Sequence, residues 1–285
     1  RYYVVGPNAA SVDALLGNYF GVNPQLVTVL EGITAKASAG SQVQYSPGTT
    51  LDRPNVNPAD WSTPEAADAD ANIVVMGLTR HLEGEEGESI LSPYSGDRLD
   101  YAIPENQMDY LRKIKGEHGK PVIAILTGGT AMDMSEVHEI ADAVLFAWYP
   151  GEEGGNAIAD ILFGHRSPSG RLPLTFPKSL DQLPDYEDYS MPGRTYRYME
   201  ATPMYPFGFG LGYTQFSYSD IALGQPEIPV GGQTTVSCQV SNTGKVAAEE
   251  VVQLYLTDKQ ASGRAPLYSL KGTKRIPLGP GESQT

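Results

Sequence analysis

The sequence predicts an α/β fold with a mostly parallel sheet in its first two thirds, followed by an all-β sandwich. Two observations predict this division. Up to about residue 170, short and uniformly apolar runs alternate with stretches of helical spacing, which is typical of βαβ units in an open parallel sheet. Beyond residue 213, apolar and polar residues alternate with period two in strand-length pieces separated by turn residues.

Four apolar runs bounded by Gly or Pro predict buried parallel strands. They are YYVVG near the start, NIVVMGL at 72–78, PVIAILTGG at 121–129 and AVLFAWYPG at 143–151. Three helices are expected, from apolar spacing and from Pro and Gly at the ends: TVLEGITAKA, PENQMDYLRKIKGEHG and EEGGNAIADILFGH. Glu152 and Glu153 begin the last of these, where negative charge complements the helix dipole.

The last third begins after residues 177–213, which are rich in Pro, Gly and Tyr and are expected to form an ordered connector. Strands are then expected at FSYSDIAL, TTVSCQVSNTG and EEVVQLYLTD. The chain opens directly on a predicted strand and stops at PGESQT, where another strand is expected. We therefore expect it to continue something longer and its β-sandwich to be truncated.

Composition narrows the function classes. The net charge of -14, from 34 acidic and 20 basic side chains, argues against nucleic acids or anionic membranes as partners and favours a neutral or cationic small molecule. No run of 18 apolar residues is present, so no membrane span is expected. The single cysteine, Cys238, excludes an intrachain disulfide and a cysteine-rich metal site.

Two short motifs fail as cofactor sites. LTGGT lacks the third glycine of a dinucleotide fingerprint and the lysine of a P-loop, and EVHEIAD lacks the second histidine of a zinc helix. We therefore expect no metal and no organic cofactor.

The stretch HLEGEEGES, residues 81–89, places four glutamates in six positions after an apolar strand: Glu83, Glu85, Glu86 and Glu88. Ligands bind in the loops that follow the carboxyl ends of parallel strands, and this stretch is such a loop. One interpretation is a solvated acidic loop, as most charge runs are. The other is that repulsion and burial raise the pKa of one carboxyl group, which then donates a proton.

Several stretches resemble the C-terminal half of glycoside hydrolase family 3, the exo-acting β-glucosidases and β-xylosidases. They include VVGPNA, GLTRHLEGEEGES followed by SGDRLDYAIPENQ, PGEEGGNAIADILFG with SGRLPLTFP, YPFGFGLGYTQFSYS, and LKGTKRIPLGPGES. The resemblance implies an (α/β)6 sandwich over residues 1–176 and, after the connector at 177–213, a truncated fibronectin-III-like domain over 214–285.

The same resemblance implies a division of catalytic labour. Retaining glycoside hydrolysis needs a nucleophilic carboxylate and a proton-donating carboxyl about 5 to 5.5 Å apart. In the family an N-terminal (β/α)8 barrel carries the nucleophilic aspartate, and the (α/β)6 domain supplies the general acid/base from a loop over the barrel mouth. This chain contains no barrel; its nearest lookalike of the nucleophile motif, Asp60-Trp61, follows Ala and is expected to be structural. The chain alone is therefore expected to be inactive.

The family pattern places the acid/base at the second glutamate of a Glu-x-Glu pair, which here is Glu85, with Glu86 as runner-up and Glu83 or Glu88 as the remaining alternatives. The Asp-Arg pair that follows closely in relatives comes later, at Asp97-Arg98. These two are expected to form a buried ion pair that shapes the loop, with direct contact to the sugar as the alternative. Glu83 and Tyr94 are expected to shape the loop or to bind substrate.

The expected function is therefore that of the C-terminal part of a retaining exo-β-glycosidase, acting on β-linked oligosaccharides or aryl glycosides. Alternatives are a carbohydrate-binding or scaffolding module without catalysis, and one chain of a split enzyme whose barrel is separate. The choice between glucose and xylose stays open, as does a homodimer. The family implies a secreted or periplasmic location.

Overall fold

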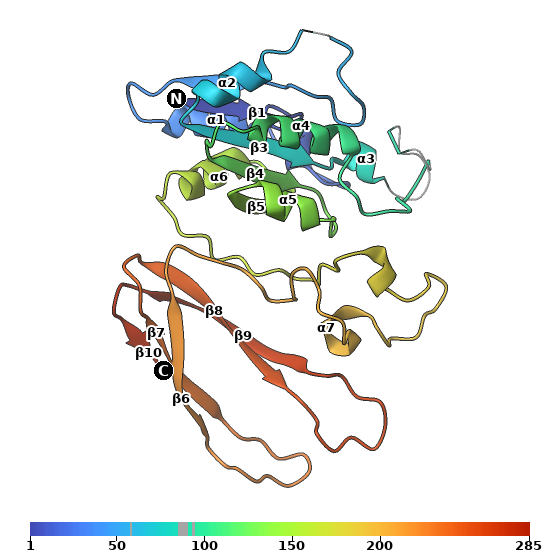
Figure 1. Ribbon diagram of the computed structural model, residues 1–285. Coiled ribbons are helices and arrows are strands. Elements are labelled where there is room, and N and C mark those ends of the chain that lie inside the picture. Colours follow the sequence, from blue (N-terminus) through green and yellow to red (C-terminus); the bar gives the residue numbers. More distant parts are fainter. Residues whose placement is uncertain (58, 85–90, 93–94) are drawn as a thin grey trace. The chain divides into compact units, whose positions relative to one another are not determined.

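The computed structural model describes residues 1–57, 59–84, 91–92 and 95–285, in two compact units (Figure 1). The first unit consists of Arg1–Phe163, Phe176–Asp185 and Thr202–Met204. The second consists of Gly164–Thr175, Tyr186–Ala201 and Tyr205–Thr285. Residues 177–213 are thus shared between the units.

The first unit is built on a parallel sheet with the strand order β2-β1-β3-β4-β5. The strands are β1 (Tyr2–Val5), β2 (Val43–Ser46), β3 (Ala71–Gly77), β4 (Val122–Thr127) and β5 (Ala143–Trp148). Four of them are the strands predicted from apolar runs, and the parallel α/β architecture is confirmed. The described part of the sheet has five strands. The sequence did not predict β2, VQYS, because this strand is only partly buried and so does not require an apolar run.

The strand order places a topological switch point between β1 and β3. The chain leaves β1 toward β2 on one side and returns through β3 on the other, so the loops after β1 and β3 diverge at the carboxyl edge. In sheets of this order, ligands bind in the crevice that this divergence creates. The acidic stretch follows β3 and therefore starts at this edge.

Helices cover both faces of the sheet (Figure 1). They are α1 (Val29–Lys36), α2 (Ser62–Asp68), α3 (Arg80–Glu83), α4 (Glu105–Lys115), α5 (Ser135–Ile140) and α6 (Gly154–Leu162). Residues of α1 and α6 share one core cluster with Val4, Ile73 and Val75, whereas α4 packs against β3 as well as against α2 and α5. The three predicted helices correspond to α1, α4 and α6.

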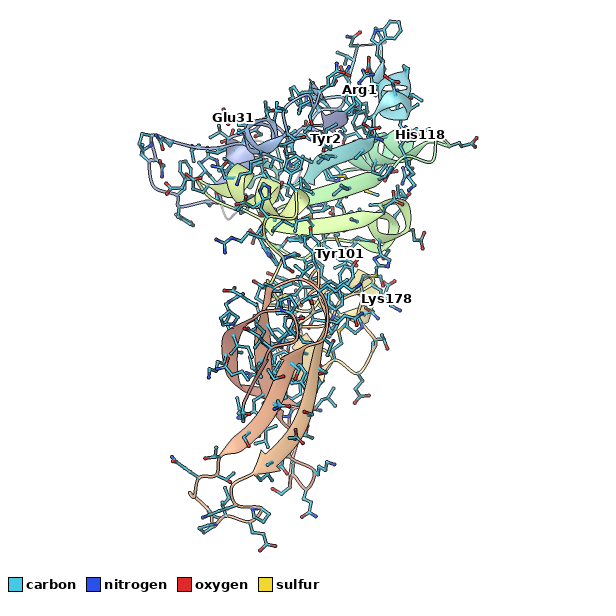
Figure 2. The ribbon with its side chains drawn as sticks, turned by 90° about the vertical axis from the view of Figure 1, so that its left-hand side faces the viewer. Arg1, Tyr2, Glu31, Tyr101, His118 and Lys178 are labelled. Carbon is cyan, nitrogen blue, oxygen red and sulfur yellow. The ribbon has the colours of Figure 1, made fainter. Side chains whose placement is uncertain are left out.

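Side-chain hydrogen bonds support the start of some of these elements. Thr28 and Glu31 form a capping box at the start of α1. Figure 2 labels Arg1, the residue that precedes β1. Its guanidinium group donates to Gln44 at 2.6 Å and to Glu65 at 2.7 Å, and so joins the start of β1 to β2 and α2. Glu153 occupies the N-cap of α6, and its carboxylate accepts a bond from the Asn156 amide at 2.6 Å.

The carboxyl end of β3 is held by a fully buried side chain of α4. The Gln107 amide accepts a bond from the Gly77 backbone N–H at 2.7 Å and donates to the Gly77 carbonyl oxygen at 3.0 Å. Gly77 has φ of 114°, and a Cβ there would lie 2.3 Å from the carbonyl oxygen of Thr127. Only glycine suits this position, and the turn it permits leads the chain directly into α3.

The second unit is all-β apart from the short helix α7 (Thr195–Tyr198). A three-stranded antiparallel sheet has the order β10-β7-β6, and β8 pairs with β9. The strands are β6 (Phe216–Leu223), β7 (Val236–Asn242), β8 (Ala248–Leu256), β9 (Ser269–Leu278) and β10 (Ser283–Gln284). This arrangement confirms the expected fibronectin-like all-β region.

A buried ion pair lies inside the second unit. Arg171 donates to Glu250 at 3.0 Å, and Glu250, which is 7% exposed, also accepts a bond from the Tyr218 hydroxyl at 3.2 Å. Within the described ranges of both units, no helix is long and apolar enough to cross a membrane.

Candidate functional site

The described part of the acidic stretch is the single helical turn α3 and the glycine that ends it. Gly84 has φ of 74°, a conformation that suits glycine, so the chain changes direction there. A helix of four residues is not stable by itself, because nucleation is unfavourable in so short a segment. Its position must therefore come from tertiary contacts, and it has such contacts at both ends.

The first end of α3 is tied to the loop after β1. The Arg80 guanidinium donates to Asp13 at 2.9 Å, and Asp13 begins a 3₁₀ turn, Asp13–Leu15. The guanidinium carbon also lies 4.2 Å from the ring centroid of Phe20, which adds a cation–π contact. These contacts cross the switch point between β1 and β3.

The last residue of α3, Glu83, is tied to the loops after β4 and β5. Both of its carboxylate oxygens accept the backbone N–H of Gly129, each at 3.1 Å, and Oε2 also accepts the hydroxyl of Tyr149. Gly129 follows β4 and Tyr149 follows β5. One carboxylate thus links the ends of three neighbouring strands.

Tyr149 is the hydroxyl donor in this arrangement. Burial and, next, the hydrogen bond to Glu83 raise the pKa of Tyr149 above its usual value. The phenol therefore keeps its proton well above neutral pH and continues to donate to Glu83.

Among the residues expected in the site, Glu83 has the contacts of a loop-shaping group. Glu85, Glu86, Glu88 and Tyr94 lie outside the described residues.

The expected Asp97-Arg98 ion pair is wrong. Arg98 donates instead to Asp100 at 2.5 Å and to the carbonyl oxygen of Ala102, while Asp97 is exposed. The reason is geometric. The carboxylate of Asp100 and the carbonyl oxygen of Ala102 both accept hydrogen bonds from the same guanidinium nitrogen of Arg98. The local shape here comes from residues 98–102.

Asp60 and Trp61 play no part at the carboxyl edge. Asp60 accepts the backbone N–H of Ser62 at 2.7 Å at the start of α2 and forms an ion pair with Lys113 of α4, while Trp61 is exposed. This agrees with their expected structural role.

Sequence reasoning missed Asp13, Arg80, Gly129 and Tyr149. The available signal was their position just after predicted strands, where ligand-binding loops begin. Within the described part of the chain, no group of three or more His, Cys, Asp or Glu side chains is placed to hold a metal ion.

Comparisons with known proteins identify relatives over the whole chain. Residues 1–213 match the model of the glycosyl hydrolase family 3 C-terminal domain, and residues 250–285 match that of the fibronectin type III-like domain. A periplasmic beta-glucosidase of Salmonella typhimurium is 35% identical over 99% of this chain and 40% of its own length. A beta-xylosidase of Formosa agariphila is 36% identical over 99% of this chain and 39% of its own length.

Solved structures show the same similarity. A β-glucosidase from Erythrobacter marinus superposes with a TM-score of 0.83 at 34% identity, covering 99% of this chain and 40% of that one. A beta-glucosidase from Listeria innocua superposes with a TM-score of 0.81 at 27% identity, covering 100% of this chain and 39% of that one. The chain thus spans about two fifths of the length of these relatives.

Proposed function

Because the chain belongs to glycoside hydrolase family 3, we propose that it supplies the general acid/base of a retaining exo-β-glycosidase. In such an enzyme one carboxyl protonates the leaving oxygen, and the same residue then deprotonates the water that releases the sugar. The relatives are named as β-glucosidases and β-xylosidases, which supports a β-linked glucose or xylose unit at the non-reducing end as substrate.

The observation that carries the proposal is the anchoring of Glu83. Both oxygens of this carboxylate accept hydrogen bonds from the protein. We therefore take Glu83 to be the residue that anchors the acidic stretch, and not its proton donor. The turn at Gly84 follows, and Glu85 is the next residue. We assign Glu85 as the acid/base and Glu86 as its runner-up. Neighbouring carboxylates favour a protonated donor, because like charges raise the pKa of one member of a group.

The remaining catalytic group lies outside the chain. An N-terminal (β/α)8 barrel of the same protein would carry the nucleophilic aspartate, about 5 to 5.5 Å from the acid/base. The chain by itself is then inactive on β-linked oligosaccharides and aryl glycosides. The name of the Salmonella relative supports a periplasmic or secreted location.

The test is Glu85→Ala in the full-length protein, with Glu86→Ala as the matched variant. General acid catalysis contributes about 10² to 10⁴ in rate, so Glu85→Ala should lose about that factor on glycosides with poor leaving groups. Aryl glycosides with strongly acidic phenols need little protonation and should lose much less in kcat/KM, although their kcat should still fall because the same residue deprotonates the attacking water. Azide should restore turnover and give a β-glycosyl azide.

Three other outcomes would change the assignment. A similar loss on all leaving groups, without azide rescue, contradicts Glu85 as donor. The selective pattern in Glu86→Ala alone moves the role to Glu86. Turnover by the chain of residues 1–285 alone, abolished by Glu85→Ala, would overturn the placement of the nucleophile elsewhere.

A further inference from the structure

We propose that Tyr149 is a positioning residue that, through Glu83, sets the position of α3, the helical turn that leads into the acid/base stretch. This inference rests on the proposed function, since it assigns what holds the donor in place. Tyr149, Glu83, Gly129 and Gly17 form the device, which we call the clasp.

The backbone before Tyr149 is shaped to aim this side chain. Trp148 has φ of 58°, which is uncommon for a non-glycine residue and is unfavourable for a bulky one. The pairing of β4 with β5 shifts register between Leu126 and Thr127, so that Thr127 pairs with Trp148. Bulges and unfavourable backbone angles often re-aim side chains next to active sites. Here the residue that follows is Tyr149, whose hydroxyl reaches Glu83.

The ring of Tyr149 lies close against two glycines. A Cβ on Gly17, in the loop after β1, would lie 3.0 Å from Cδ2 of the tyrosine, and a Cβ on Gly129 would lie 3.1 Å from Cε2. The Gly129 Cβ would also lie 3.1 Å from Oε2 of Glu83. The clasp therefore joins the loops after β1, β3, β4 and β5, and no side chain fits at either glycine without displacing the ring.

A backbone hydrogen bond also joins two of the loops that the clasp connects. The N–H of Gly151 donates to the carbonyl oxygen of Leu15 at 2.9 Å, which joins the loop after β5 to the loop after β1 a second time. With Arg80 bound to Asp13 at its first residue and Glu83 bound in the clasp at its last, α3 has little freedom to move. These contacts therefore set the position of Gly84, the residue that ends α3.

This placement has a catalytic consequence. A displacement of about 1 Å in a catalytic group can cost about 10²-fold in rate. Loosening the clasp should reduce proton donation while leaving nucleophilic attack and substrate binding nearly unchanged. The expected signature is a lower kcat/KM whose loss depends on the leaving group, because kcat/KM reports the step in which the leaving oxygen is protonated.

The test is Tyr149→Phe in the full-length protein, which removes one hydroxyl and keeps the ring. We expect kcat/KM to fall about tenfold, equivalent to about 1.4 kcal/mol, on glycosides with poor leaving groups. On activated aryl glycosides it should fall less than about twofold, because these need little protonation. Glu83→Gln should give the same pattern, and the double variant should lose no more than either single one.

Tyr110→Phe is the matched control. Its hydroxyl is also buried and also bonded, at 2.8 Å to Ser62, but it lies in α4 and does not touch the clasp. Tyr110→Phe should lower Tm about as much as Tyr149→Phe does. Its effect on kcat/KM, in contrast, should not depend on the leaving group. If Tyr149→Phe does not fold, Glu83→Gln serves by itself, because the amide keeps the size of the side chain.

The outcomes separate the two proposals. If Glu85→Ala or Glu86→Ala shows the selective loss but Tyr149→Phe and Glu83→Gln behave like Tyr110→Phe, the clasp proposal is overturned and the proposed function stands. If neither Glu85→Ala nor Glu86→Ala shows the selective loss, the assignment of the donor fails, and the clasp has no donor to position.

Discussion

Replacing Gly32 with alanine should force apart the two helices that cover one face of the sheet. Gly32 of α1 faces Gly155 of α6, and a Cβ on Gly32 would lie 2.0 Å from the carbonyl oxygen of Gly155. Because real Cβ contacts essentially never fall below 3.0 Å, the backbones must separate by about 1 Å in a close-packed interior. The obstacle is backbone, so no side chain can turn away to relieve it.

The size of the effect follows from two opposing contributions. In an exposed helix the change from glycine to alanine stabilises by about 1 kcal/mol. Here the separation loosens the packing of Val29, Ile33 and Ile158, which are all almost completely buried. Overpacking of this kind costs about 1 to 3 kcal/mol or more. We expect a net loss of about 2 kcal/mol.

Urea unfolding followed by tryptophan fluorescence measures this loss. Both tryptophans of the chain, Trp61 and Trp148, belong to the first unit, so the signal reports on that unit. With a slope of about 2 kcal/mol/M, the midpoint should fall by about 1 M. Gly21→Ala is the control, because a Cβ on this exposed loop glycine meets nothing within 4 Å and the midpoint should not fall. A midpoint for Gly32→Ala at or above that of the wild type would refute the reasoning.

Two further predictions concern buried and capping charges. Arg171→Met leaves the carboxylate of Glu250 buried without its cation, so the second unit should lose about 3 to 5 kcal/mol in thermal unfolding. Adding Glu250→Met should recover most of this, and an equal loss in single and double variants would contradict the explanation. Thr28→Ala removes the capping box of α1 and should cost about 1 kcal/mol near pH 7. The backbone N–H and then the hydroxyl of Thr28 hold the pKa of Glu31 below its usual 4.5, so this stabilisation is present above pH 4.5 and is lost as the pH falls further. Denaturation of wild type and variant across this range should show the gap narrowing, and a gap independent of pH would exclude Glu31 as its source.

Much of the fold could be predicted because burial leaves a direct mark on the sequence. A strand covered on both faces must be apolar at every position, as NIVVMGL and PVIAILT are. Elements without that constraint were missed. The strand β2 is only partly buried, and α2, α3 and α5 are too short for an apolar period to be recognised.

The candidate site was predictable only in outline. The crowding of glutamates after an apolar strand indicated an acidic loop at the carboxyl edge, and the resemblance to a family gave that loop a role. Neither indicated Tyr149, because 66 residues separate it from Glu83 along the chain. The Asp97-Arg98 pair failed for the opposite reason. Adjacent opposite charges are a local pattern, but a guanidinium group can reach several acceptors, and Asp100 and Ala102 provided them.

The sequence by itself determined the α/β region, the all-β region after it, the family and the acidic stretch, because apolar periodicity and motif residues lie within short segments. The tertiary structure decided which glutamate is the anchor and what holds it. Glu83 is fixed by groups from the loops after β4 and β5, and only the sheet order brings those loops beside the end of β3. Hydrogen bonds depend on distances in space, and the strand order that sets these distances cannot be read from neighbouring residues.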